Sequence, residues 1–512
     1  MKFRDSNRMT QKSVFIIFIF LLHFFVFECV AYSESTKKIV YRGFYSRIVT
    51  NFNNIDNEIN YNRFGRLVSY RGLANIIPDI AYKWEIQKQG KLFVFHLRKK
   101  IYFHDGSLLK ASHIKKSLEF KLKNGSFLFL DNDVIVGQKA YFEKKTNHIK
   151  GIRSLDDNTI SIELKRSYPF FLRALATLNF PIFKYKKGKI TGTGPYVLKE
   201  QESSNSVIRK VRFSKFEKYY ISLDEQPDQI IVFDLDKNYE NFRPDILSIS
   251  SINVDEINKM GNSFRKYKTF ETFVHAIFFN IKSQWGGNIN FRNFIGFGFD
   301  FRRAVKKVYR IHSAAVHNII PLNLSSARKV PAFPQYNYSR SLYYLKKIRD
   351  KNKEVRMVIF LLPGRKKIGD KLKFFLIKHG FKVKEKIFDI MKPGNVRKVL
   401  FDADIIVAGY NDREDIFNSE FFLYRSLNLR GEDNVFNYRN QYIDEITRKL
   451  VMGEIRNRVA AMKFIVNLLI EDMIIIPLNY SSTYFFVGNG VKLKVPPQMP
   501  FLDYRIIRVN EK

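Results

Sequence analysis

Cysteine is almost absent from this chain, since Cys29 is the only one in 512 residues. One thiol cannot form an internal disulfide, an iron–sulfur cluster or a cysteine zinc site. Cys29 also lies in a segment that we expect to be removed, which would leave no cysteine nucleophile. A chain of this length can instead hold its fold by burying apolar side chains.

Acidic residues are also scarce: 49 Asp and Glu face 88 Lys and Arg, a formal net charge of +39. Such an excess attracts polyanions such as nucleic acid, lipopolysaccharide or anionic lipid. The basic residues are, however, spread along the whole chain and accompany abundant Asn, Ile, Phe and Tyr, as an AT-rich genome produces. We therefore favour compositional drift over a selected polyanion site, and expect no specific nucleic-acid partner.

Catalytic motifs are missing too. The sequence contains no HExxH zinc motif and no GxSxG nucleophile elbow. It also shows no internal repeat or heptad array. These absences argue against an enzyme, and we expect neither a cofactor nor a bound metal.

The first 31 residues have the pattern of a secretory signal peptide. Basic residues precede the apolar run Ser13–Phe27, which is too short to favour spanning a bilayer, and small residues follow at Cys29 and Ala31. We expect cleavage after Ala31. The alternative is a lipoprotein anchor on Cys29, although Phe27 and Glu28 match such processing poorly.

A hairpin and a helix organise the region that follows. Ala81–Ile86 and Leu92–Leu97 alternate apolar and other residues around the turn Gln89-Gly90, which predicts an antiparallel hairpin with one buried face. After a turn at Asp105-Gly106, apolar residues return at helical spacing, and Ser112 is placed to cap the helix.

These segments also carry a resemblance. Three short sequence motifs occur in order, at Ala81–Glu85, Phe95–Lys99 and Phe103–Gly106. Together they resemble the signature of bacterial extracellular solute-binding protein family 5. That family comprises the oligopeptide-, dipeptide- and nickel-binding components of ABC importers. Gly192–Tyr196 (GTGPY) and Ile474–Leu478 extend the resemblance, which covers about Val68 to Leu478.

The resemblance implies an α/β fold of the periplasmic-binding-protein type, with two lobes closing on a ligand cleft and the first lobe split into two subdomains. We expect the main subdomain of lobe I at residues 32–66, 185–268 and 476–512, the second subdomain at 67–184 and lobe II at 269–475. Within lobe II, Arg356–Leu362 and Gly380–Val383 read as strands around a helix at Ile368–His379.

The implied function is capture of a peptide or similar small solute in the periplasm, by a monomer, and delivery to an inner-membrane ABC permease. Nickel and haem remain possible ligands within the family. The alternative is an exported adaptor or polyanion-binding protein that kept the fold and lost the solute.

One segment resembles the family's ligand loop. In Val407–Phe422, Asp412 corresponds to the aspartate that receives the ligand's α-ammonium in several peptide binders, with Tyr410 in place of a tryptophan. The segment is one residue shorter than the family pattern and lacks its proline, so a solvated loop is the alternative. We select Asp412, Tyr410, Asn411 and Arg71 as ligand-binding candidates, because Arg71 stands where the family often has an acidic residue.

Two further motifs suggest sites but favour structural roles. His104 beside Asp105 could be a metal ligand or proton carrier, but a His-Asp-Gly turn is more often a hydrogen-bonded corner. The glycines of Gly192–Tyr196 could cradle a phosphate, but no Gly-Lys-Ser/Thr follows, and Pro195 lacks a donor. We therefore expect a tight crossover between domains.

Overall fold

A computed structural model describes residues 39–45, 52–71, 75–124, 133–186, 188–204, 207–235, 244–250, 264–269, 273–309, 319, 332–361, 363–388, 396–411, 423, 438–497 and 502–509. The expected signal peptide, including Cys29 and Ala31, lies outside these residues. In the part of the chain that is described, no helix is both long and apolar enough to cross a membrane.

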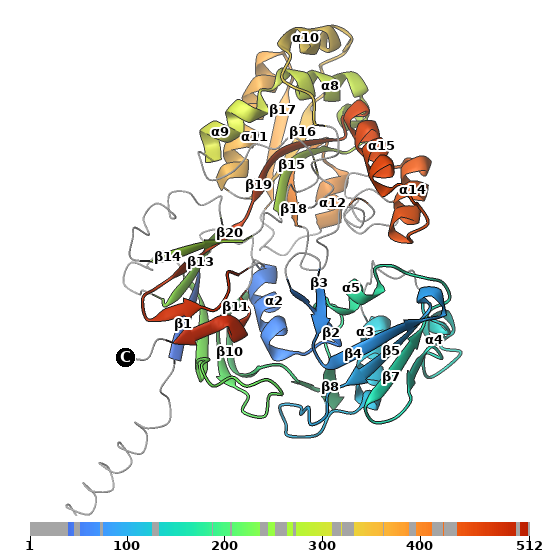
Figure 1. The fold of residues 1–512 in the computed structure, drawn as a ribbon. Coiled ribbons are helices and arrows are strands. Elements are labelled where there is room, and N and C mark those ends of the chain that lie inside the picture. Colours follow the sequence, from blue (N-terminus) through green and yellow to red (C-terminus); the bar gives the residue numbers. More distant parts are fainter. Residues whose placement is uncertain are drawn as a thin grey trace, which may run out of the picture.

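Lobe I is built on a seven-stranded sheet with β1 near its centre (Figure 1). Its order is β10 (Tyr196–Ser204), β11 (Val207–Lys215), β12 (Gln229–Leu235), β1 (Ile39–Tyr45), β13 (Ile246–Ser250), β20 (Thr483–Val487) and β14 (Arg265–Lys268). β1 runs parallel to β12 and β13, and its Val40 joins a core with Phe213 and Phe485. Helix α2 (Phe52–Arg63), the hairpin β21 (Val491–Leu493) and β22 (Ile507–Val509), and the 3₁₀ turn η6 (Tyr504–Ile506) also contribute residues to this core.

A second sheet forms the other part of lobe I. It is antiparallel, in the order β4 (Ala81–Gln87), β5 (Leu92–Leu97), β7 (Thr159–Glu163) and β6 (Ile152–Ser154). Around it lie α3 (Ala111–Asn124), α4 (Gln138–Phe142), α5 (Phe171–Leu175), and the hairpins β2 (Val68–Arg71) with β3 (Asn75–Pro78) and β8 (Phe183–Lys186) with β9 (Lys189–Gly192). The predicted hairpin is confirmed, with the 3₁₀ turn η1 (Lys88–Gly90) joining its strands.

The predicted cap of the following helix is wrong. Helix α3 begins at Ala111, so Ser112 lies inside its first turn. The free N–H group of Lys110 instead donates to Nδ1 of His113 at 3.0 Å. A histidine ring therefore performs the capping that we assigned to the serine hydroxyl.

Lobe II is a five-stranded sheet with helices on both faces. Its order is β17 (Val383–Phe388), β16 (Val355–Phe360), β18 (Ile405–Asn411), β15 (Phe273–Phe279) and β19 (Ile475–Ser481). Ile277 and Phe279 of β15 face α7 (Gln284–Gly287), α8 (Ile289–Gly298), α9 (Phe301–Tyr309), α10 (Tyr338–Lys346) and α11 (Pro363–Lys378). Ala276 and Phe278 face α12 (Val396–Phe401), α14 (Gln441–Val451) and α15 (Arg458–Glu471), as the alternation of a strand requires.

The chain crosses between the lobes twice in the described residues. β14 of lobe I leads into β15 of lobe II, and β19 of lobe II leads through Ser482 into β20 of lobe I (Figure 1). All of β19 pairs in the lobe II sheet, so the second crossing comes after Ser481 and not at the expected boundary of 476. The two crossings are tied together, since the Thr269 N–H donates to the Thr483 carbonyl and the Thr483 N–H to Thr269 Oγ1, each at 2.9 Å.

Candidate functional site

One end of the lobe II sheet faces lobe I, and polar residues gather there. β15 enters the sheet at Phe273 and β19 leaves it at Ser481, so both crossings join this end. β18 runs antiparallel to β15, and β16 and β17 run parallel to β18, so the carboxyl ends of these three strands lie at this same end of the sheet. We call this end the lobe-facing edge. In open α/β sheets, the carboxyl ends of the strands are where ligands bind.

A buried polar chain lies at this edge. Arg365, in the first turn of α11 just after β16, donates from Nε to Nδ1 of His275 at 3.1 Å. His275 Nδ1 must then be unprotonated, so Nε2 carries the proton and donates to Oγ of Ser481 at 3.1 Å. These contacts join the end of β19 to the start of β15 and to α11.

Burial also sets the charges of these hydrogen-bonded side chains. It lowers the pKa of His275 well below its usual range, an effect that the positive charge of Arg365 reinforces, so the imidazole is neutral. Burial lowers the pKa of Arg365 to about 10, which still leaves the guanidinium protonated at neutral pH. Arg365 therefore brings a positive charge to the lobe-facing edge.

The expected ligand residues fall partly on this edge. Tyr410 and Asn411 are the last residues of β18, paired with Val274 and Phe273 of β15. Asp412 lies outside the described residues, as does most of the segment after it. Arg71 ends β2, whose hairpin with β3 projects toward lobe II in Figure 1.

Sequence reasoning missed Arg365, His275 and Ser481. A usable signal was present, because Pro363-Gly364-Arg365 directly follows an apolar run that we had read as a strand. A cation at the carboxyl end of a parallel strand is a candidate ligand residue by position alone. Its burial, which draws attention to it in the structure, depends on packing against distant segments.

The lobes also meet at a second place. Val451 and Met452, at the end of α14, are buried in the core of the second subdomain. Gly453 follows with φ +70°, and a Cβ built there would lie 2.4 Å from Cγ of Pro169. The Arg458 guanidinium lies 5.0 Å from the ring centroid of Phe170. We call this contact between residues 451–458 and 168–171 the distal contact, because no crossing of the chain lies there.

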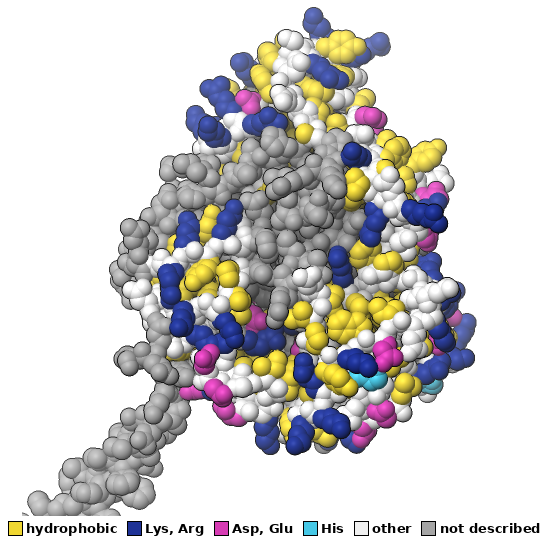
Figure 2. All heavy atoms as spheres, viewed as in Figure 1, with side chains coloured by type: hydrophobic (Ala, Val, Ile, Leu, Met, Phe, Trp, Pro, Cys, Tyr) yellow, Lys and Arg dark blue, Asp and Glu magenta, His cyan; other side chains and the backbone are white. Residues whose placement is uncertain are grey.

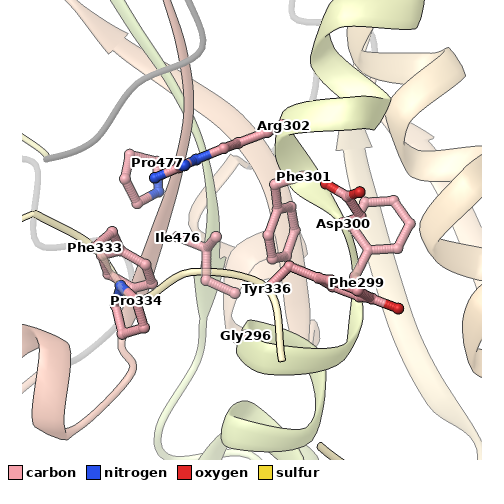
Figure 3. Close-up of a pocket in the computed structure, with 10 residues that line it drawn as sticks. All are labelled: Gly296, Phe299, Asp300, Phe301, Arg302, Phe333, Pro334, Tyr336, Ile476 and Pro477. Carbon is pink, nitrogen blue, oxygen red and sulfur yellow. The ribbon is translucent and has the colours of Figure 1, made fainter. Parts of the chain in front are cut away.

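A small pocket lies between β19 and the helices α8 and α9 of lobe II (Figure 3). Phe299, Phe333 and Pro334 help to line it, together with Ile476 and Pro477 of the edge strand β19. Its cavity volume is about 30 Å³, which leaves room for about two water molecules. This pocket is too small to hold a peptide.

The geometry agrees with the structural roles that the sequence favoured for His104 and for the glycines of Gly192–Tyr196. Nε2 of His104 makes a hydrogen bond of 3.0 Å to the Gly194 carbonyl, which fits a corner. Gly192 and Gly194 pack on the end of α2, where added Cβ atoms would lie 2.1 and 2.5 Å from backbone atoms of Arg63. The described residues hold no group of three or more His, Cys, Asp or Glu side chains arranged to bind a metal.

Sequence comparison finds relatives of this chain. Residues 75–410 match the family model described as bacterial extracellular solute-binding proteins, family 5 Middle. The dipeptide-binding protein of Escherichia coli is 28% identical over 180 residues, which is 31% of this chain and 32% of that protein. Heme-binding protein A of Haemophilus influenzae is 25% identical over 287 residues, 50% of this chain and 51% of that protein. These matches thus span about a third to a half of the relatives' length.

Solved structures match nearly the whole chain. The Helicobacter pylori periplasmic binding protein DppA in complex with the peptide STSA gives a TM-score of 0.77 at 17% identity, covering 94% of this chain and 100% of that one. The Escherichia coli murein tripeptide-binding protein MppA gives 0.75 at 15% identity, covering 93% and 99%. At such identities the match shows the fold, which is the expected two-lobed α/β architecture.

Proposed function

Because the chain belongs to the bacterial extracellular solute-binding proteins of family 5, we propose that it captures a peptide or similar small solute between its lobes and delivers it to an ABC permease. The observation that carries this proposal is the lobe-facing edge, where both crossings, three strand ends and a buried arginine meet. We propose that it works in the periplasm as a monomer and without chemistry on the solute.

Capture requires only that the lobes close. Thr269 and Thr483 join the two crossings into one narrow connection, which is the geometry of a hinge. A solute that contacts both lobes binds the closed form better than the open one and shifts the population toward it. The distal contact lies away from the crossings and would be made or broken by this motion.

The residues proposed to hold the solute come from both lobes. Asp412 follows Asn411 at the end of β18, and Arg365 follows the neighbouring strand β16. A carboxylate and a guanidinium on adjacent strand ends suit the two opposite charges of a free peptide. Arg71 would add a cation from lobe I, and Tyr410 an aromatic surface.

Substitution of Asp412 by Asn tests this assignment. The change keeps the size of the side chain and removes its charge, leaving the solute's ammonium without a counter-charge in a closed site. We expect a loss of about 2–5 kcal/mol in binding, or roughly 30-fold or more in affinity. Calorimetry with a library of di- and tripeptides measures it, and the unfolding temperature of the solute-free protein should hardly change.

Asp415→Asn is the matched control, because it removes the same charge three residues away and should matter less. Equal peptide binding by the wild type and Asp412→Asn would exclude Asp412 as the ammonium anchor. Absence of peptide binding by the wild type would exclude a peptide as the solute. The positive charge of Arg71 would then favour an anionic solute as the next ligand to titrate.

A further inference from the structure

One outer surface of lobe II combines clustered cations with exposed apolar side chains. It is formed by the outward sides of α9, α10 and α11, and we call it the α9–α11 face. All four exposed residues of α9 are cations, namely Arg302, Arg303, Lys306 and Lys307. Figure 2 shows Lys and Arg side chains on the upper lobe, where Figure 1 places α9 and α10, as well as on the lower lobe.

These cations differ from many on the second subdomain of lobe I. There, lysines are repeatedly paired with carboxylates, as Lys88 is with Glu163 and Lys110 with Asp157. On α9, neither Arg303, Lys306 nor Lys307 makes an ion pair with any residue of the described chain. Uniform drift does not explain a helix whose whole exposed side is cationic, so this face has its own positive field.

Apolar side chains stand out on the same face. Phe374 and Ile377 lie one turn apart on α11 and are 70% and 51% exposed. The start of α10 adjoins the end of α11, where the Tyr338 hydroxyl and Nε2 of His379 lie 2.9 Å apart. α9 packs against the other end of α11, where its Tyr309 ring abuts Gly364. Since α11 rises about 1.5 Å per residue, Phe374 lies about 15 Å along this helix from Gly364, where α9 packs.

We propose that the α9–α11 face binds the surface of a bilayer that contains anionic phospholipids. Lysine and arginine side chains would meet the phosphate groups, while Phe374 and Ile377 enter the boundary between headgroups and acyl chains. Charge complementarity favours a polyanion, and the exposed aliphatic and aromatic side chains favour a bilayer over nucleic acid, because Ile377 offers no ring on which a base could stack.

This placement is compatible with the proposed capture of solute. The face belongs to the helical layer on one side of the lobe II sheet, whereas the solute edge is the end of that sheet that faces lobe I. Cleavage after Ala31 would remove Cys29, and this face would then hold the protein near the membrane. Binding to lipid and binding to solute should therefore be separable by mutation.

Co-sedimentation of the purified mature protein with vesicles tests the proposal. One set of vesicles contains phosphatidylcholine alone, and the other contains about a third phosphatidylglycerol, which supplies the negative surface. We expect binding to the anionic vesicles only, weakening as salt rises. The triple variant Arg303→Gln, Lys306→Gln, Lys307→Gln should bind roughly tenfold more weakly or worse.

Two further variants make the result specific. Lys99→Gln, Lys116→Gln, Lys150→Gln removes the same charge from exposed positions on the second subdomain and should bind almost as the wild type does. Phe374→Ser, Ile377→Ser keeps every charge and should still lose most vesicle binding. Equal losses in the two charge variants, equal binding to both vesicle types, or heparin binding without vesicle binding would each overturn the proposal. Solute affinity should be unchanged in all three variants.

Discussion

His104 is held in the corner between the two subdomains of lobe I, where it bonds to the Gly194 carbonyl. Burial lowers its pKa to about 4, although the bond to Gly194 acts in the opposite direction. The unfolded chain has the ordinary value near 6.5 and binds the proton more readily. The contribution of His104 to stability is therefore complete above pH 6.5 and declines as the pH falls toward 4.

Replacement of His104 by Gln should reduce the acid sensitivity of folding. Between pH 7 and pH 4.5 the wild type should lose about 2–3 kcal/mol of unfolding free energy that the variant retains, because Gln does not titrate. Urea unfolding at the two pH values measures this difference, and His275, buried in both proteins, cancels from the comparison. Equal losses in the two proteins would show that His104 is protonated without cost in the folded state.

Gly453 follows helix α14 and is part of the distal contact between the lobes. Its φ of +70° and its closeness to Pro169 leave no room for a side chain. Gly453→Ala should therefore push residues 451–453 away from the second subdomain and favour the open form. We expect a larger radius of gyration by X-ray scattering without solute and a weaker affinity for solute, since closure becomes more costly.

Gly380→Ala provides the matched control for this change. Gly380 also ends a helix with positive φ, +87°, but only Cδ of Lys351 comes within 4 Å of its added Cβ, at 3.9 Å. It should lose stability through backbone strain while keeping the radius and the affinity of the wild type. Similar radii and affinities in both variants would mean that the distal contact does not influence closure.

The elements of lobe I were easier to predict than those of lobe II. Ala81–Ile86 and Leu92–Leu97 have one buried face and a turn between them, so alternation revealed both strands. We expected the second strand of the lobe II unit at Gly380–Val383, whereas β17 runs from Val383 to Phe388. β17 is an edge strand, and its Lys384 and Lys386, which protect the edge from pairing, made the segment read as polar.

The proposed solute site could be predicted only in part. The resemblance in Val407–Phe422 indicated the end of β18, and the structure places Tyr410 and Asn411 there. Arg365 follows a predicted strand, but its bond to His275 could not be found from local patterns. The two residues are 90 positions apart in the chain and meet only when α11 packs on the lobe II sheet. Local patterns identify strands, whereas a buried polar chain depends on the tertiary fold.

The whole molecule combines two lobes, a narrow double crossing and a helical face rich in cations. The central claim is that the lobes close on a small solute, and a native mass spectrum of the protein purified from exporting cells tests it most directly. We expect a mature chain beginning at Tyr32 that carries a small molecule, and we expect Asp412→Asn to lose that molecule. A wild-type chain that is always empty, and that binds no member of a peptide library or anionic solute set, would contradict the claim.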